Sequence, residues 1–301
     1  MTRIPEIELA FSNACTADCF VCSKTHGGTN EPFMSQAVFD AAVRQMHDID
    51  FDTVQTGGDG DSFLNPIYLD ALRTLRREFP GKRVVLYSNF ALLTPEIADV
   101  LIGENLITDL FTRVDSVIGQ AFTISTGLDM DAVFSNIDYF LSKNKAISFQ
   151  INYSNIKKYR ENCLSVLGKD PYQWDECLGW APDDEWTAVC DRFTHGNYIP
   201  RINEIRRSLW AERNNPAIKP EPDMPCQRTH CFENVCYVWT DGDVGICGYD
   251  DGQDAMIVGN VLETPIAEIW TSDRRRKMIE HVTNRGIKGY PCINPRACLF
   301  Y

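Results

Sequence analysis

The sequence predicts an α/β protein in which parallel strands alternate with helices through the first half of the chain. Apolar and polar residues alternate at residues 7–11 and 146–153, which is the period of a strand. Apolar residues recur at helical spacing at residues 38–46 and 129–141. Strands and helices that take turns at such short intervals form parallel βα units. Polar or glycine-rich loops follow the predicted strands, as expected if the working loops share the carboxyl edge of a parallel sheet.

The first elements follow from local signals in chain order. The strand at residues 7–11 leads into a cysteine-rich loop, and Ser35 is a typical N-cap for the helix that reaches Met46. A short apolar strand is expected at residues 51–55, where it breaks into a glycine-rich loop. The next helix is expected around residues 67–79.

A further strand at residues 83–87 ends at Ser88 and Asn89. Thr94 before Pro95 predicts another helix start, because proline is favoured at the first helical position. The remaining elements of the first half are expected at residues 110–114, 129–141 and 146–153.

The second half of the chain gives weaker signals. Residues 168–191 are aromatic and acidic without periodicity, and we interpret them as an insertion that borders the substrate. A helix is expected at residues 201–213. The proline-rich stretch at residues 215–225 is typical of a linker, so we expect one domain at residues 1–214 and a second, with its linker, at residues 215–301.

Composition excludes several classes of function. The chain has 42 acidic and 29 basic residues and a net charge of -13, whereas nucleic-acid binding requires clustered lysine and arginine. No apolar run is long enough for a membrane span, and the N-terminus lacks an export signal, so a cytoplasmic protein is expected. Acidic runs at residues 183–185 and 250–254 would attract a cationic substrate, although an acidic surface can also serve solubility alone.

Cys15, Cys19 and Cys22 form a C-x3-C-x2-C loop after the first strand. Three thiolates this close can hold three corners of a four-iron cluster, and with no fourth cysteine nearby one iron would accept an outside ligand. A zinc site is the alternative, but structural zinc prefers four protein ligands in close pairs. Disulfides are not expected in a chain that is not exported.

This spacing closely resembles that of the radical S-adenosylmethionine (radical SAM) superfamily. The resemblance implies a 4Fe-4S cluster held by Cys15, Cys19 and Cys22, with S-adenosylmethionine chelating the open iron. In that family an electron, supplied by a flavodoxin- or ferredoxin-like donor, cleaves the cofactor to a radical that takes a hydrogen atom from a C–H bond. The resemblance also implies a partial (βα)6 TIM-type barrel. The family often has an aromatic residue where this chain has Val21.

The glycine-rich loop comprises Gly57, Gly58, Asp59, Gly60 and Asp61. Glycines allow positive φ and close approach to a ligand, and an aspartate can accept a hydrogen bond from an ammonium group. Alone, such a stretch indicates an ordinary turn. It resembles, however, the family's Gly-x-Gly-Glu-Pro stretch, which holds the amino group of the cofactor, with Asp61 in place of the glutamate.

A second cofactor contact is implied by the residues after the third of these strands. Residues 87–93, Tyr-Ser-Asn-Phe-Ala-Leu-Leu, resemble the family's Thr-Asn-Gly-x-Leu-Leu stretch but lack its glycine. The resemblance places Ser88 or Asn89 near the carboxylate or ribose of S-adenosylmethionine.

Half of the twelve cysteines lie in the last quarter of the chain: Cys226, Cys231, Cys236, Cys247, Cys292 and Cys298. Between them, Asp241-Gly242 predicts a tight turn between strands at residues 237–240 and 244–247, and Thr264-Pro265 predicts a following helix. This series resembles the SPASM and twitch extensions of the superfamily, in which a hairpin and helix surround an auxiliary 4Fe-4S cluster. A zinc ribbon is the structural alternative.

The resemblance implies an auxiliary cluster bound by Cys231, Cys247, Cys292 and Cys298, with Cys226 as an alternative ligand. Six cysteines fit a twitch extension with one cluster better than a full SPASM domain with seven cysteines. One of Cys226, Cys236 or Cys247 is then left as a candidate hydrogen-atom donor.

The overall reaction is a hypothesis drawn from the same resemblance. Short twitch-bearing members include enzymes of aminoglycoside and aminocyclitol assembly in antibiotic biosynthesis, and an acidic chain suits a small, cationic carbohydrate. We therefore expect an epimerase acting on an aminoglycoside carbon. The alternatives are dehydrogenation of an aminocyclitol alcohol, peptide modification, and a metal-binding scaffold without turnover.

Overall fold

The computed structural model describes residues 1–19, 31–58, 60–154, 185–194, 196–203, 229–248 and 256–283. The chain divides into two compact units, each built from several segments. Unit 1 comprises residues 1–15, 24–86 and 220–297, and unit 2 comprises residues 16–23, 87–219 and 298–301. The boundary expected at residue 214 lies outside the described residues.

Unit 1 contains strands that pair in the order β11 (Ile257–Asn260), β10 (Asp243–Gly245), β9 (Val235–Val238), β2 (Glu6–Leu9), β4 (Thr53–Thr56) and β5 (Arg83–Tyr87). The run from β9 to β5 is parallel, whereas β9, β10 and β11 are antiparallel. A separate parallel pair joins β1 (Thr2–Arg3) to β3 (Ile49–Asp50). The predicted hairpin around Asp241-Gly242 is confirmed as β9–β10.

The strand register places polar side chains on one face of this sheet. Glu8 in β2 lies opposite Gln55 in β4 and Tyr237 in β9. Successive side chains of a strand point to opposite faces. Thr56, the residue after Gln55, shares a 2.8 Å hydrogen bond with the hydroxyl of Tyr68 in α2. Glu8, Gln55 and Tyr237 therefore lie on the face away from α2, which we call the polar face.

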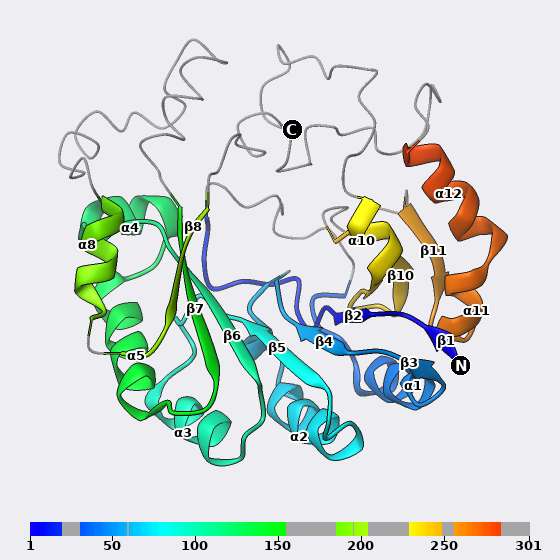
Figure 1. The fold of residues 1–301 in the computed structure, drawn as a ribbon, viewed down its shortest axis with the longest axis horizontal. Helices are drawn as coiled ribbons and strands as arrows, with labels where there is room; N and C mark the ends of the chain where they lie inside the picture. Colours follow the sequence, from blue (N-terminus) through cyan, green and yellow to red (C-terminus); the bar gives the residue numbers. More distant parts are fainter. Residues whose placement is uncertain are drawn as a thin grey trace, which may run out of the picture. The chain divides into compact units, whose positions relative to one another are not determined.

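The helices of unit 1 are α1 (Gln36–Met46), η1 (Ser62–Leu64), α2 (Tyr68–Glu78), α10 (Thr229–Asn234), α11 (Ile266–Thr271) and α12 (Asp273–Thr283). The Ser35 hydroxyl accepts a hydrogen bond from the Val38 N–H at 3.3 Å, which confirms the predicted N-cap of α1. The helix buries Val38 and Phe39 and ends at buried Met46. In Figure 1, α1 and α2 lie on the same side of β2 and β4.

Unit 2 contains the parallel strands β6 (Asp109–Val114), β7 (Ser148–Ser154) and β8 (Ile199–Asn203). Its helices are α3 (Pro95–Gly103), α4 (Gly119–Thr126), α5 (Met130–Lys143) and α8 (Glu185–Arg192). The rings of Phe90, Phe140 and Phe149 pack with centroids 5.2–5.9 Å apart. The expected α/β class with mostly parallel strands is thus confirmed.

Two expectations for unit 2 need correction. The prediction of a helix at residues 201–213 is wrong for residues 201–203. These residues belong to β8, which pairs with β7. Pairing of a β-branched segment overrides weak helical periodicity, and the remainder of residues 201–213 lies outside the described residues. The sequence reading also missed α4, whose N-cap makes no side-chain hydrogen bond. Its end is marked by Gly127, at φ 72°.

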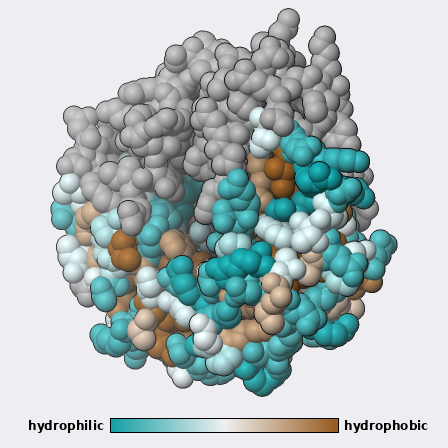
Figure 2. Space-filling model, turned by 45° about the vertical axis from the view of Figure 1, so that its right-hand side comes forward, coloured by the Kyte–Doolittle hydropathy of each residue, from teal (hydrophilic) through white to brown (hydrophobic). Residues whose placement is uncertain are grey.

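The described residues on the face drawn in Figure 2 are mostly polar. Figure 2 shows mainly hydrophilic and neutral residues with scattered apolar ones. Large exposed apolar side chains among the described residues include Ile124, Ile199 and Leu262. None of the helices in the described ranges combines the length and the hydropathy that crossing a membrane would require.

Candidate functional site

In unit 1 the first part of the cysteine loop is held by the glycine-rich loop. The Ser12 hydroxyl donates to the carbonyl of Ala14 at 2.8 Å, and the Asp61 N–H donates to the same carbonyl at 2.8 Å. Cys15, which follows directly, is half-buried. Two stretches that the sequence assigned separately to cluster and cofactor binding are therefore in direct contact.

Gly60 is the residue that permits this contact. A Cβ atom at position 60 would lie 2.4 Å from the carbonyl oxygen of Ala14 and 2.5 Å from that of Ser12. Both atoms belong to the backbone, so neither can move without moving the loop that carries Cys15. The glycine is required here by close approach of two backbones.

Gly60→Ala should therefore displace the cysteine loop and lower the iron bound after anaerobic reconstitution. Gly81→Ala is the matched control, because a Cβ atom at position 81 meets no atom within 4 Å. The measurement is iron content and the visible absorption of the reconstituted proteins. Full iron content in Gly60→Ala would show that the packing of Gly60 is unimportant for the loop.

The other residues of the glycine-rich loop that the structure describes are Gly57, Gly58 and Asp61. Gly57 and Gly58 have φ values of 115° and 118°, which confirms the expected positive φ. Asp61 is 4% exposed and accepts a hydrogen bond from the Phe63 N–H, so it caps η1. Its contact with a cofactor ammonium group stays a prediction, and Asp59 lies outside the described residues.

In unit 2 the second part of the cysteine loop contacts the Ser88-Asn89 turn. The side-chain amide of Asn89 donates to the hydroxyl of Thr16 at 3.0 Å. The Asp18 N–H, next to half-buried Cys19, donates to the carbonyl of Thr126 at the end of α4 at 2.8 Å. The sequence pointed to Asn89 but gave no signal for the contact with α4, because α4 itself lacks a clear periodicity.

The Ser88-Asn89 turn is shaped by its own side chains. The Ser88 hydroxyl accepts from the Phe90 N–H at 3.0 Å, and the Asn89 side-chain oxygen accepts from the Ala91 N–H at 2.9 Å. Phe90 has φ 62°, a value that glycine adopts more easily than phenylalanine. These hydrogen bonds stabilise a turn for which the family's own stretch has a glycine.

Sequence reasoning missed a charged pair at the end of β6. The Nε atom of Arg113 lies 2.8 Å from Oδ1 of Asp115, which is completely buried. Arg113 lies opposite Asn152 in the register of β6 and β7, and Asn152 accepts a hydrogen bond from Gln150 at 2.7 Å. The sequence could have identified this pair, because Arg113 and Asp115 flank the last residue of the strand predicted at residues 110–114.

The C-terminal cysteines that the structure describes lie in different surroundings. Cys231 lies in α10, and half-buried Cys247 follows β10. Cys236 in β9 is 1% exposed and lies opposite Ile7, on the face away from Glu8. Cys22, Cys226, Cys292 and Cys298 lie outside the described residues.

Burial raises the pKa of the Cys236 thiol to about 12 from an ordinary value of 9.0, with a smaller opposing effect from the charge of Arg275 in α12. Since thiolate is the reactive form, folded protein should leave Cys236 unmodified by iodoacetamide at pH 8. Its unfavourable ionisation also makes the free energy of unfolding fall as the pH rises from 9 towards 12, because the unfolded chain loses this proton first.

Peptide mass spectrometry after alkylation of native and denatured protein tests this assignment. Modification of Cys236 only after denaturation is the expected result. The high-pH decline in unfolding free energy should also be shallower in Cys236→Ala. Rapid modification of native Cys236 would contradict its position in the core.

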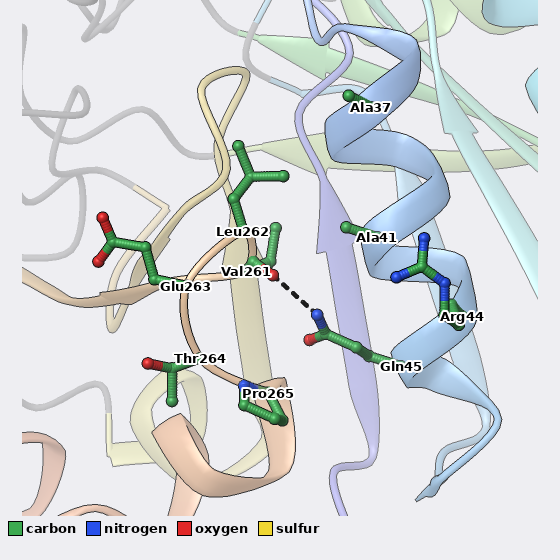
Figure 3. Close-up of a pocket in the computed structure, with 9 residues that line it drawn as sticks. All are labelled: Ala37, Ala41, Arg44, Gln45, Val261, Leu262, Glu263, Thr264 and Pro265. Carbon is green, nitrogen blue, oxygen red and sulfur yellow. Dashed lines mark hydrogen bonds between the residues drawn. The ribbon is translucent and has the colours of Figure 1, made fainter.

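The segment that follows β11 is joined to α1 by hydrogen bonds of one side chain. Gln45 in α1 donates to the carbonyl of Val261 at 2.7 Å (Figure 3). Its side-chain oxygen accepts from the Ile266 N–H at 2.8 Å. Beside these bonds is a surface pocket of about 260 Å³ between α1 and residues 261–265. No cysteine lines it. Gln45 thus fixes the segment after β11 on the helix that begins after the cysteine loop.

The residues present fit iron-sulfur chemistry by donor type. Cys15, Cys19 and Cys247 are half-buried thiols, and thiolates are the ligands that iron-sulfur clusters take. Within the described ranges, no three side chains of the metal-ligating types come together, and Cys22 and three of the C-terminal candidates fall outside those ranges.

Comparison with known families identifies the C-terminal part of the chain. Residues 226–298 match the SPASM family, an iron-sulfur cluster-binding domain. The matched range begins and ends at predicted ligands, Cys226 and Cys298. The expected auxiliary iron-sulfur cluster is confirmed at the level of the domain. No curated protein sequence matches the chain significantly.

Solved structures share the fold over nearly the whole chain. BtrN in complex with AdoMet and 2-DOIA has a TM-score of 0.52 and 14% identity, covering 95% of this chain and 89% of that chain. SuiB of Streptococcus suis bound to precursor peptide SuiA has a TM-score of 0.61 and 15% identity, covering 92% and 67%. Native anSMEcpe with bound AdoMet has a TM-score of 0.56 and 16% identity, covering 92% and 83%. At these identities the likeness establishes the fold.

Proposed function

We propose that this chain is a radical SAM enzyme of the SPASM/twitch subgroup, on the basis of its cysteine loop, its SPASM domain and its fold, and that it epimerises a carbon of an amine-rich carbohydrate such as an aminoglycoside. The observation that carries the proposal is the position of Cys247. It is half-buried after β10, whereas Cys236 lies in the core.

A 4Fe-4S cluster would be held by Cys15, Cys19 and Cys22, and S-adenosylmethionine by the loops at residues 57–61 and 88–89. Bound together, the two groups supply a radical that removes hydrogen from a C–H bond. The chain's part is to hold the cofactor and the substrate and to exclude water. The rigid contact between Gly60 and the backbone at Ser12 and Ala14 serves the first of these roles.

We assign to Cys247 the return of a hydrogen atom to the substrate. A Cβ atom on Gly248, the residue after Cys247, would lie 2.4 Å from the ring of Tyr237. Tyr237 belongs to the polar face, opposite Glu8. The backbone next to Cys247 therefore lies over the same face as Glu8 and Gln55. Cys226, Cys231, Cys292 and Cys298 then complete the auxiliary cluster.

In this reaction one substrate C–H bond is broken, and a new one forms when the thiol S–H of Cys247 gives its hydrogen atom to the opposite side of the carbon. An external donor of flavodoxin or ferredoxin type supplies the electron that starts each turnover, and further reducing equivalents restore the thiol. Because the thiol hydrogen exchanges with water, turnover in heavy water should place one deuterium in the product. Mass spectrometry of the product tests this, and an unlabelled product would count against epimerisation.

Dehydrogenation of an aminocyclitol alcohol is the second candidate. It is favoured by the shared fold of BtrN, whose structure contains AdoMet and 2-DOIA. In this case the substrate loses two hydrogens in all, and an electron passes to the auxiliary cluster. The product would be two mass units lighter than the substrate and would carry no solvent deuterium.

Peptide modification is the third candidate, since SuiB is bound to a precursor peptide in a solved structure of the same fold. A scaffold that binds metal without turnover is the non-enzyme alternative. It would produce no 5'-deoxyadenosine from S-adenosylmethionine.

A further inference from the structure

We infer that Arg275 is a positioning residue of the auxiliary iron-sulfur cluster. It holds helix α10, which carries Cys231, and its charge raises the reduction potential of the cluster. This inference rests on the proposed function, because it takes Cys231 to be a ligand of that cluster. Arg275 lies in α12 and is used by no step of the reaction described above.

The first argument is that Arg275 differs from the basic residues around it. Arg274, Arg276 and Lys277, its neighbours in α12, are exposed, whereas Arg275 is half-buried. Burial lowers the pKa of Arg275 to about 10 from an ordinary value of 12.5, with a smaller opposing effect from Cys236. The guanidinium is therefore still charged at neutral pH. Arginine is one of the residue types that proteins bury least often, so this position needs a reason.

The second argument is the way in which the guanidinium is held. Its central carbon lies 3.4 Å from the ring centroid of Trp270 in α11, and Nη1 donates to the carbonyl of Trp270 at 3.2 Å. Stacking on an indole ring fixes the orientation of a planar guanidinium. The other terminal nitrogen, Nη2, donates to the carbonyl of Phe232 in α10. Arg275 thus joins α11 and α12 to α10.

The third argument is the place of the Phe232 carbonyl in the chain. Phe232 is 1% exposed and follows Cys231 directly in α10, a helix of six residues. In so short a helix, a hydrogen bond to one carbonyl also restrains the backbone of the residue before it. The contact with Arg275 therefore restrains the backbone at a predicted cluster ligand.

The fourth argument is that the partners of Arg275 are neutral groups. No carboxylate in the described part of the chain forms an ion pair with it. Asp273, the nearest acidic residue in the sequence, pairs with Arg276 at 2.7 Å. Carbonyl groups and an indole ring stabilise the guanidinium without cancelling its charge. A full positive charge therefore stays at the contact with α10.

These features explain what an arginine does beside a cluster ligand. The reduction potential of an iron-sulfur cluster depends on the charge, hydrogen bonds and solvent exposure around it. Reduction adds one negative charge to the cluster. A partly buried positive charge stabilises the reduced form more than an exposed charge does, because water screens it less. Arg275 should therefore make the auxiliary cluster a better electron acceptor.

Redox titration of the reconstituted holoenzyme, followed by electron paramagnetic resonance, tests the inference. S-adenosylmethionine should change only the signal of the cluster with an open iron, so the unchanged signal reports on the auxiliary cluster. Arg275→Gln removes the charge and should shift the reduction equilibrium of this cluster about tenfold towards the oxidised form, which is about 59 mV for one electron. Arg275→Lys keeps the charge without the planar stack and should shift it much less.

Arg274→Gln is the matched control, because it removes the same charge from an exposed neighbour in α12. It should leave the potential unchanged. A wild-type potential in Arg275→Gln, or an equal shift in Arg275→Lys or Arg274→Gln, would overturn the inference. Loss of the auxiliary cluster's iron in Arg275→Gln but not in Arg275→Lys would support it. Loss in both would overturn it, because Arg275 would then have a structural role alone.

A further variant separates this inference from the proposed function. Cys231→Ala should lose the iron of the auxiliary cluster. Retention of that iron would refute the assignment of Cys231 as a ligand, on which the inference rests. Loss of that iron, together with an unshifted potential in Arg275→Gln, would refute the inference alone. Solvent deuterium in the product reports on epimerisation and is independent of both results.

Discussion

Cys15→Ala and Cys19→Ala should each remove the iron of one cluster and abolish the cleavage of S-adenosylmethionine. Each replacement takes away one of three thiolates, and the remaining pair cannot hold three corners of a four-iron cluster. The fold should persist, because both side chains are only half-buried and small. Iron analysis and 5'-deoxyadenosine formation after anaerobic reconstitution measure the effect.

Cys190→Ala is the control for this pair. Cys190 is also half-buried, but it lies in α8 and outside both predicted cluster sites. It should keep full iron content and full cleavage. Retention of cleavage by Cys15→Ala or Cys19→Ala would mean that the loop does not hold the catalytic cluster.

Cys247→Ala has the second largest expected effect, because it should stop product formation without stopping hydrogen abstraction. The substrate radical then has no thiol from which to recover a hydrogen atom, while cofactor cleavage does not involve this residue. Epimerised product and its solvent deuterium should fall below detection, and 5'-deoxyadenosine should still form with substrate present. Liquid chromatography with mass spectrometry measures both.

Iron content gives the same variant a second readout. If Cys247 is the hydrogen donor, Cys247→Ala keeps the iron of both clusters. A loss of one cluster's iron would instead make Cys247 a ligand of the auxiliary cluster, and Cys226 would become the candidate donor. Cys236→Ala should retain product formation, since its thiol lies on the opposite face of β9.

The sequence predicted the order of the early strands and helices because their signals are local. Ser35 caps α1 as expected, and the Asp241-Gly242 turn joins β9 and β10 as expected. Residues 201–203 were assigned wrongly because partner strand β7, distant in sequence, decides their conformation.

Contacts across the site were harder to predict than the motifs. The glycine-rich loop was recognised, but nothing local indicates that Gly60 packs on the carbonyls of Ser12 and Ala14. Glu8 was interpreted only as a polar residue in an alternating strand, although the register makes it the neighbour of Gln55 and Tyr237. Such juxtapositions depend on strand order, which the sequence does not state.

The most direct test of the account is whether the reconstituted chain cleaves S-adenosylmethionine. Anaerobic protein with dithionite and S-adenosylmethionine should yield 5'-deoxyadenosine, and an amine-bearing ring that is a substrate should increase its rate of formation. Cys15→Ala serves as the blank. No 5'-deoxyadenosine from fully iron-loaded wild-type protein, with or without such a ring, would contradict the assignment of radical chemistry to this chain.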